Sequence, residues 1–283
     1  MGSYLRPATL AEAIEALARA ADDGRPGVIV AGATDHYPAR VGRVTDDDVI
    51  DVTGIAGLRA IEPADGGWRI PALATWTDVA TADLPPLFDG LRRAARTIGG
   101  RQIQNRATVV GNLVNASPAA DGTPNLLALD AEVVLASVRG ERRVPVAAFV
   151  TGNRTTVRAA DEIVTGLFIP ALDSSVRSTF LKLGSRAYLV ISIAMVAAVV
   201  AVDATRRVTH ARVAVGACSP VARRLWDLEA ALVGQPAAPG VGATVRPEHL
   251  AGLSPIDDVR GTGTYRLEGA EALVRRALEE LAA

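Results

Sequence analysis

Two polar loops that contain glycine carry residue types suited to binding a phosphate group. The first follows the apolar stretch Val28–Ala31 and reads Gly32-Ala33-Thr34-Asp35. Small residues at the end of a strand leave backbone N–H groups uncrowded, and such a concavity suits a phosphate or a pyrophosphate. An ordinary turn has the same appearance, so this loop alone leaves both interpretations open. It is not the dinucleotide fingerprint, because Gly-x-Gly-x-x-Gly before a helix does not occur in the sequence.

The second loop spans residues 106–121 and is polar, with charges only at its two ends. Its hydroxyl and amide side chains include Thr108, Asn112 and Asn115, and apolar residues are scattered without helix or strand periodicity. Irregular segments of this length are often functional. From the residues alone, a role in binding and a role as a plain connection are equally open.

Other kinds of active site find little support. The histidines at positions 36, 210 and 249 are far apart and lack zinc-binding spacing. Cys218 is the single cysteine, which excludes an internal disulfide and any zinc or iron–sulfur site built from several local thiolates. We expect Cys218 to be a buried, inert thiol. A nucleophile elbow (Gly-x-Ser-x-Gly) and a P-loop are absent from the sequence.

A series of short elements must position the two loops. Thr9 and Glu12 form a capping-box pattern for a helix over residues 10–21, and a strand over 28–31 leads into the first loop. The remaining expected elements are strands at 49–52 and 132–137, a hairpin of 58–61 with 68–70, a helix at 87–98 and a helical turn at 126–129.

The sequence pattern changes near residue 172, where short mixed elements give way to successive strands and then helices. This change predicts two domains, 1–172 and 173–283. In the second domain we expect strands at 180–183, 190–202 and 210–216, followed by helices at 222–232 and 270–281. The apolar run 187–202 contains Ser192 and is shorter than the ~20 residues that span a bilayer, so a buried strand is favoured.

The composition agrees with a two-domain globular protein of 283 residues. Hydrophobic residues make up 49% and aromatic residues 4%, so the core must be largely aliphatic. The 30 basic and 31 acidic residues are mixed along the chain and predict no basic face for nucleic acid. We expect a cytoplasmic protein that binds neither nucleic acid nor membranes.

Several motifs, in the right order over nearly the whole chain, resemble those of the FAD-binding subunits of molybdenum hydroxylases, the xanthine dehydrogenase and carbon monoxide dehydrogenase flavoprotein family. Residues 31–35 read Ala-Gly-Ala-Thr-Asp where the family has Ala-Gly-Gly-Thr-Asp, and residues 108–112 read Thr-Val-Val-Gly-Asn where it has Thr-Ile-Gly-Gly-Asn. The segments 102–106, 117–121, 149–152 with 161–164, and 258–266 continue the resemblance.

The resemblance implies an α+β fold, with a FAD-binding domain of the vanillyl-alcohol-oxidase (PCMH) type in two subdomains. A small C-terminal α+β domain with a three-stranded antiparallel sheet follows. FAD would lie extended between the subdomains, with its pyrophosphate on the first loop and the flavin near Lys182 and Tyr188. The implied cofactor-binding residues are Ile29, Val30, Ala31, Gly32, Ala33, Thr34, Asp35, His36, Ile98, Gly99, Thr108, Gly111, Asn112, Asn115, Asp121, Val164, Lys182 and Tyr188.

Three residues depart from the family pattern. Ala33 replaces the second Gly of the first loop, and Val110 replaces the first Gly of the Gly-Gly pair in the second. If position 110 required φ > 0, a β-branched residue there would be strained and FAD affinity would fall. His36 replaces an apolar residue, and it could reach the flavin or face solvent.

The function implied by the resemblance is electron transfer. In this family a molybdenum centre hydroxylates the substrate, and electrons pass through iron–sulfur clusters to FAD and then to NAD or another acceptor. Because this chain has one cysteine, the expected partners are an iron–sulfur subunit and a molybdopterin subunit. We expect neither a metal site nor a catalytic side chain here, since the cofactor carries the chemistry. A self-standing FAD oxidoreductase and a non-catalytic assembly subunit that has lost FAD are the two alternatives.

Overall fold

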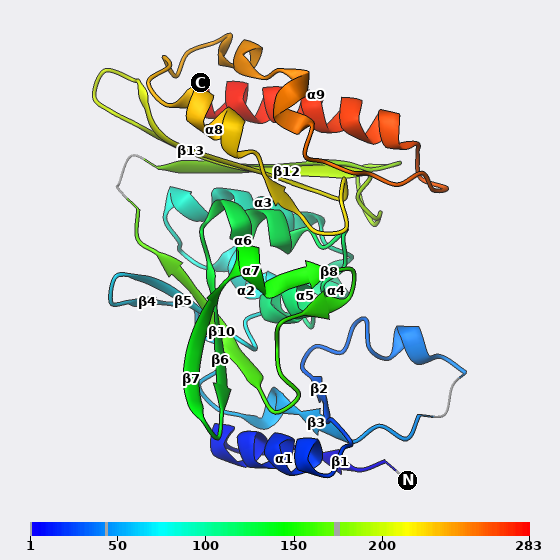
Figure 1. Cartoon of the computed structure of the whole chain (residues 1–283). Coiled ribbons are helices and arrows are strands. Elements are labelled where there is room, and N and C mark those ends of the chain that lie inside the picture. Colours follow the sequence, from blue (N-terminus) through cyan, green and yellow to red (C-terminus); the bar gives the residue numbers. More distant parts are fainter. Residues whose placement is uncertain (1, 43–44, 173–175) are drawn as a thin grey trace.

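The computed structural model describes residues 2–42, 45–172 and 176–283, and it stacks three groups of elements along one axis (Figure 1). A small sheet with helix α1 lies at one end. Helices and a five-stranded sheet occupy the middle, and a four-stranded sheet covered by two helices forms the other end. Within the described residues, no helix has the length and apolar character needed to cross a bilayer.

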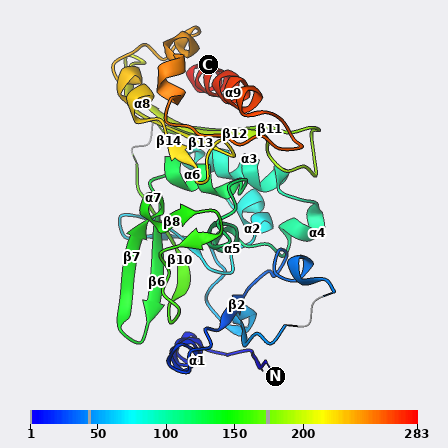
Figure 2. The same cartoon turned by 45° about the vertical axis from the view of Figure 1, so that its right-hand side comes forward.

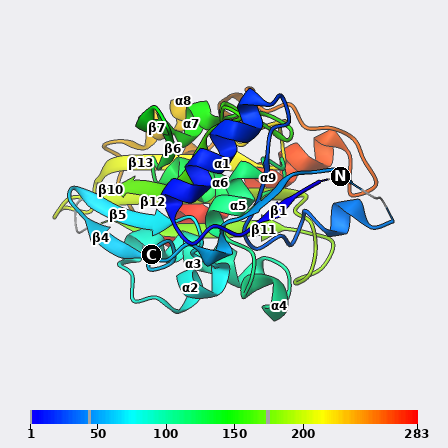
Figure 3. The same cartoon turned by 90° about the horizontal axis from the view of Figure 1, so that it is seen from below.

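The first group is a parallel sheet whose strand order is β1-β3-β2. Its strands are β1 (Tyr4–Leu5), β2 (Val28–Val30) and β3 (Val49–Asp51), and α1 (Leu10–Asp22) lies across this end of the molecule (Figure 3). The Thr9 hydroxyl accepts from the Glu12 amide, so the predicted helix start is confirmed. Short 3-10 turns follow at Pro38–Arg40 and Val52–Gly54.

The middle sheet is antiparallel, in the order β4-β5-β10-β6-β7. Its strands are β4 (Glu62–Ala64), β5 (Gly67–Pro71), β6 (Glu132–Ser137), β7 (Gly140–Pro145) and β10 (Ile163–Pro170). The expected hairpin is present, but its first strand is 62–64, so the prediction of 58–61 is wrong. Asp65 and Gly66 form a two-residue turn that sets Ala64 opposite Gly67, while Leu58 is buried in the core.

Helices pack beside this sheet and fill the centre of the molecule. They are α2 (Trp76–Thr81), α3 (Asp89–Thr97) after a 3-10 turn at Pro86–Phe88, α4 (Arg101–Gln104), α5 (Val109–Val114), α6 (Gly122–Ala128) and α7 (Val146–Phe149). A two-stranded ribbon, β8 (Val150–Gly152) with β9 (Thr155–Thr156), follows α7. The second loop therefore contains a helix, α5, which the sequence did not predict. Thr108 caps it, and Val109, Val110 and Leu113 are buried on one side.

The C-terminal sheet is antiparallel and contains β11 (Arg177–Leu183), β12 (Ala194–Val202), β13 (Val208–Gly216) and β14 (Arg223–Arg224) in that order. Three long strands are present as expected, with β14 added at the edge. Because β14 pairs with β13, helix α8 (Trp226–Leu232) begins later than the predicted residue 222. Helix α9 (Gly263–Ala282) begins earlier than predicted, capped by the Thr262 side chain, and 3-10 turns at Val241–Thr244 and Pro247–Leu250 precede it.

The two faces of strand β12 belong to different hydrophobic clusters. Met195, Ala197 and Val199 pack with the core formed by the five-stranded sheet and its helices, whereas Val196 and Ala198 pack beneath α8 and α9. Burial on both faces explains why this strand is an uninterrupted apolar run.

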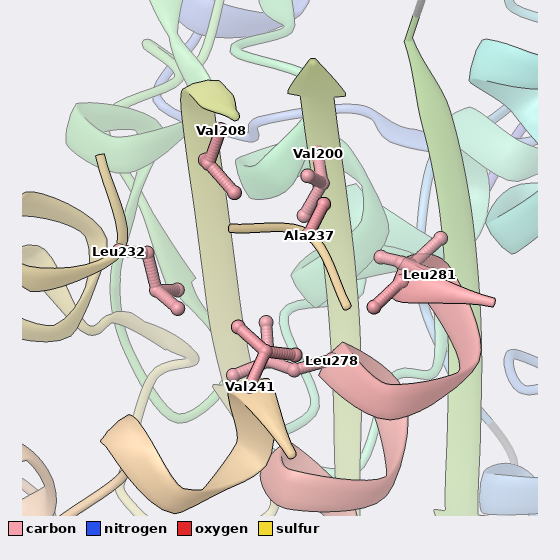
Figure 4. Close-up of a pocket in the computed structure, with 8 residues that line it drawn as sticks. Val200, Val208, Leu232, Ala237, Val241, Leu278 and Leu281 are labelled. Carbon is pink, nitrogen blue, oxygen red and sulfur yellow. The ribbon is translucent and has the colours of Figure 1, made fainter. Parts of the chain in front are cut away.

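A small apolar cavity remains between β12, β13 and α9. Side chains from these elements point toward one another around it (Figure 4). Its volume of about 10 Å³ is barely enough for one water molecule, so it is a packing gap rather than a ligand site. Its lining residues are Val200, Val208, Leu232, Ala237, Val241, Leu278, Leu281 and Ala282.

Candidate functional site

The first loop leaves the end of β2 and turns sharply at Ala33. Ala33 has a φ of 54°, and the Tyr37 amide donates to its carbonyl at 3.3 Å. A left-handed conformation costs a residue with a Cβ about 1–2 kcal/mol. Of the two replacements of a family glycine, Ala33 and Val110, it is therefore Ala33 that strains the backbone.

Gly32 brings the two loops into direct backbone contact. A Cβ placed on Gly32 would lie 2.0 Å from the Arg106 carbonyl oxygen and 2.9 Å from the Ala107 Cα. Only glycine permits this approach. The sequence predicts only a phosphate-binding role for Gly32, and its contact with the second loop is visible only in the structure.

The second loop is fixed by a short backbone exchange with the start of α2. The Trp76 amide donates to the Ala107 carbonyl at 3.1 Å, and the Val109 amide donates to the Ala74 carbonyl at 3.0 Å. The Thr108 hydroxyl accepts from the Gly111 amide at 2.9 Å. A Cβ on Gly111 would meet only this hydroxyl within 4 Å, so the side of α5 that carries Gly111 is open.

Val110 lies in α5 and is buried, and it is not among the described residues with positive φ. The condition under which Val110 would be strained is therefore not met. The backbone strain at Val110 that would have supported the assembly-subunit alternative is therefore absent.

Arg154 ties the first loop to the second. Its Nη1 donates to Asp35 Oδ2 at 2.9 Å and also to the Asn115 side-chain oxygen. Its backbone amide donates to the Ala116 carbonyl at 2.9 Å, which anchors the turn between β8 and β9. Arg154 and Asp35 are 119 residues apart in sequence, and no local signal identified Arg154.

A buried ionic cluster joins the start of α6 to the C-terminal sheet at Asp121. Lys182 Nζ lies 2.7 Å from Asp121 Oδ2, and Ser192 Oγ donates to Asp121 Oδ1 at 2.5 Å. Asp121 is 4% exposed, Ser192 is fully buried and the Lys182 side chain is 11% exposed. Lys182 is the single lysine of the chain, since the other basic residues are arginines. In the sequence Ser192 is only an interruption of an apolar run, and its hydrogen bond to Asp121 was not predicted.

Asn112 connects α5 to this cluster. Its side-chain oxygen accepts from the Gly122 amide at 3.1 Å, directly beside Asp121 at the start of α6. Contacts therefore run without a break from Gly32 through the second loop and α6 to β11. This extended arrangement suits an extended dinucleotide, with uncrowded backbone amides at one end and a buried charged cluster at the other.

The C-terminal motif holds Ser192 in place. Arg266 is 1% exposed; its guanidinium donates to the Ile193 carbonyl and to Asp258 Oδ1, each at 2.7 Å. Hydrogen bonds from Arg260 and then Arg266 hold the pKa of Asp258 well below its usual value. The segment that carries Ser192 is thereby fixed against the start of α9.

The other predicted site residues are placed less uniformly. Gly99, with φ of 55°, leads into α4, and α4 reaches the second loop through a 2.7 Å bond from the Ala107 amide to the Ile103 carbonyl. Ile98, Ile29 and Ala31 are partly buried and pack against the hydrophobic core of the middle of the molecule. Val30 is buried at the end of β2. Thr34 is half-buried beside Asp35.

Three predicted residues stand apart from these contacts. Val164 is buried in β10 opposite Leu135. Tyr188 is 70% exposed on the loop between β11 and β12, and it does not join the buried cluster at Asp121. Burial, reinforced by Arg40, lowers the pKa of His36, so its imidazole is neutral near pH 7.

Among the described residues no group of His, Cys, Asp and Glu side chains could hold a metal ion. Cys218 is fully buried, and burial raises the pKa of its thiol to about 11. The expectation of a buried thiol is confirmed. High pKa and lack of access make it a poor nucleophile.

Comparisons with known proteins identify the family. A family model described as the FAD binding domain in molybdopterin dehydrogenase matches residues 1–172, and one described as the CO dehydrogenase flavoprotein C-terminal domain matches residues 179–281. The nicotinate dehydrogenase FAD-subunit of Eubacterium barkeri is 34% identical over 82% of this chain and 80% of its own. The glyceraldehyde dehydrogenase medium chain of Sulfolobus acidocaldarius is 28% identical over 99% of this chain and 98% of its own.

Solved structures agree with these matches. Carbon monoxide dehydrogenase from Hydrogenophaga pseudoflava gives a TM-score of 0.87 at 26% identity, covering 98% of this chain and 96% of that one. Quinoline 2-oxidoreductase from Pseudomonas putida 86 gives 0.89 at 26% identity, covering 100% and 97%. The predicted α+β FAD-binding fold is confirmed. The chain belongs to the family of FAD-binding subunits of molybdenum-containing dehydrogenases, and its cofactor is FAD.

Proposed function

We propose that this chain holds FAD along the two loops and the Asp121 cluster, and that it passes electrons from iron–sulfur clusters on a partner chain through FAD to NAD or another acceptor. The observation that carries the proposal is the unbroken run of contacts from Gly32 through Asn112 to Lys182. The names of relatives support the partners, because they include a carbon monoxide dehydrogenase medium chain and a subunit of a 6-hydroxypseudooxynicotine dehydrogenase complex.

In this proposal the first loop binds the pyrophosphate through backbone amides around Gly32 and Thr34, and the open side of α5 at Gly111 leaves room for it. Asp121 orients the polar part of the cofactor, and Lys182 supplies a fixed positive charge near the flavin. FAD supplies the redox chemistry when bound. Ile98 and Gly99 bound the site with apolar and backbone surface, and we place the domain division near residue 172.

The first experiment measures cofactor identity. The purified chain should be yellow and should release FAD rather than FMN on denaturation. A colourless protein that does not take up added FAD would contradict the proposed site.

The single lysine offers a sharper test of where FAD binds. An amine-reactive ester can modify only Lys182 and the amino terminus, so peptide mass spectrometry reports Lys182 alone. Saturation with FAD should slow modification of Lys182, whereas modification of the amino terminus should not change and serves as the internal control. Equal rates at Lys182 with and without FAD would place the cofactor elsewhere.

The partners are tested by native purification of the protein from its source, followed by metal analysis. We expect co-purification of a cysteine-rich iron–sulfur protein and a large molybdenum protein. The isolated chain should not hydroxylate substrates. Recovery of the chain alone, with substrate turnover of its own, would favour a self-standing FAD oxidoreductase.

A further inference from the structure

A polar cleft lies where α3 meets the start of β11 and the end of α9. Its volume is about 160 Å³, so it can hold ordered water or a small ligand. Helix α3 runs beneath the β11 edge of the C-terminal sheet (Figure 2), and none of the lining residues belongs to the two loops or the Asp121 cluster. The lining residues are Asp89, Arg92, Arg93, Arg96, Arg177, Ser178, Glu280 and Leu281.

The cleft carries an excess of positive charge. Four guanidinium groups and two carboxylates line it, which leaves two positive charges uncompensated. Arg92 pairs with Asp89, and Arg93 pairs with Glu280. Arg93 Nη1 also donates to the Thr179 hydroxyl at 2.8 Å.

The two remaining arginines have no carboxylate partner among the described residues. Arg177 Nη1 donates only to the Leu281 carbonyl, at a long 3.4 Å, and the Arg96 guanidinium makes no hydrogen bond in that part of the chain. Arg96 comes from α3 and Arg177 from β11, so the two unpaired groups approach the cleft from different domains.

The cleft concentrates positive charge at an accessible surface, because Arg96 and Arg177 are both exposed. Arg92 and Arg96 are four residues apart on α3, where like charges repel, and Arg93 adds a third positive charge to the same helix. Guanidinium groups bind phosphate oxygens through paired N–H donors, so several of them around one cleft match an oxyanion in charge and geometry.

We propose that this cleft binds a small phosphate-bearing anion, with Arg96 and Arg177 donating to its oxygens and with Arg92 and Arg93 adding to the positive field. The bound anion joins α3 of the first domain to β11 and α9 of the second. Its occupation therefore stabilises the contact between the two domains. The ligand is free phosphate or the phosphate group of a nucleotide.

The test uses FAD-saturated protein, so that added phosphates do not compete for the flavin site. Calorimetric titrations at constant ionic strength are made with inorganic phosphate and, separately, with ADP. At least one of them should bind saturably at one site per chain and raise the melting temperature. Binding of inorganic phosphate indicates free phosphate, and binding of ADP alone indicates a nucleotide.

Arg96→Gln and Arg177→Gln should each weaken this binding about tenfold or more, since each removes charge-assisted hydrogen bonds. Arg223→Gln is the matched control, because it removes the same charge from an exposed position at the opposite edge of the same sheet, and it should bind as the wild type does. Circular dichroism and flavin content should be unchanged in all three variants. The proposal is overturned if neither probe binds saturably, or if both cleft variants keep wild-type affinity.

Discussion

Replacing Lys182 with Met tests whether the buried ionic cluster stabilises the junction between the domains. Met has a similar length and no charge, so the change leaves the Asp121 carboxylate buried without its ionic partner. Ser192 still donates to Asp121 Oδ1, but Oδ2 loses the 2.7 Å contact with Nζ. The remaining hydroxyl cannot neutralise a charge that is 4% exposed.

The expected loss follows from how deeply the pair is buried. Removing one partner of a buried ion pair costs about 3–5 kcal/mol, because the other charge stays desolvated. The Lys182 side chain keeps 11% of its surface exposed, which places the expectation at the lower end, about 3 kcal/mol. Ser192→Ala removes one hydrogen bond to a charged group and should cost about 1.5–3 kcal/mol.

The assay is urea unfolding of the FAD-free protein, followed by circular dichroism. The double variant Asp121→Asn with Lys182→Met should recover much of the loss of Lys182→Met, because it removes the orphaned charge as well. Lys182→Arg keeps the positive charge but changes its shape. It should also lower the free energy of unfolding, since a planar guanidinium does not fit a site shaped for an ammonium group. A loss below about 1 kcal/mol for Lys182→Met, or a double variant that is less stable than either single one, would refute this reasoning.

Three further predictions concern the loops and the thiol. Ala33→Gly should raise the free energy of unfolding by up to about 1 kcal/mol, because glycine adopts the observed φ of 54° without a Cβ penalty; unchanged stability in urea would contradict this. Gly32→Val should abolish FAD uptake and also lower the melting temperature, since its side chain collides with the Arg106 backbone; a variant that loses FAD at full stability would show that the collision is relieved. Cys218 should not react with a disulfide reagent at pH 8 until the protein unfolds. Because its folded pKa is about 11 and its ordinary value is 9.0, the unfolded chain loses the proton first; the stability of the wild type relative to Cys218→Ala should therefore fall between pH 9 and 11.

Elements with strong local signals could be predicted from the sequence. The Thr9 cap defined the start of α1, and the strand at 132–137 has the bounds that its β-branched residues indicated. The helix α5 was missed, because its six residues are too few to show periodicity and its stability comes from the Thr108 cap and from burial. The start of α8 was misplaced for a different reason. Arg223 and Arg224 are compatible with a helix, and only pairing with β13 makes them a strand.

The residues of the candidate site could be predicted from the sequence only in part. The sequence identified Gly32, Thr108 and Asp121 through their resemblance to a family, but it could not identify Arg154 or Ser192. These two residues meet their partners across 119 and 71 positions of sequence. The Arg154–Asp35 contact forms only once residues 1–172 have folded, and the Ser192–Asp121 contact only once the C-terminal sheet has packed on them. A pattern within a loop carries no information about such partners.

Strand β12 explains why the Asp121 cluster needs the C-terminal sheet. Its alternate side chains belong to two clusters, so the C-terminal sheet completes the core of the first domain on one face and its own core on the other. The same packing brings β12 and β13 over α6 and β11 over α3, and it sets Lys182 against Asp121. Gly90 in α3 allows this close approach, because a Cβ there would lie 2.9 Å from the Thr179 carbonyl oxygen of β11. Separating the domains would expose that face of β12 and leave Asp121 without either of its partners. The charged end of the proposed FAD site is therefore a consequence of domain packing, and it cannot form within residues 1–172 alone.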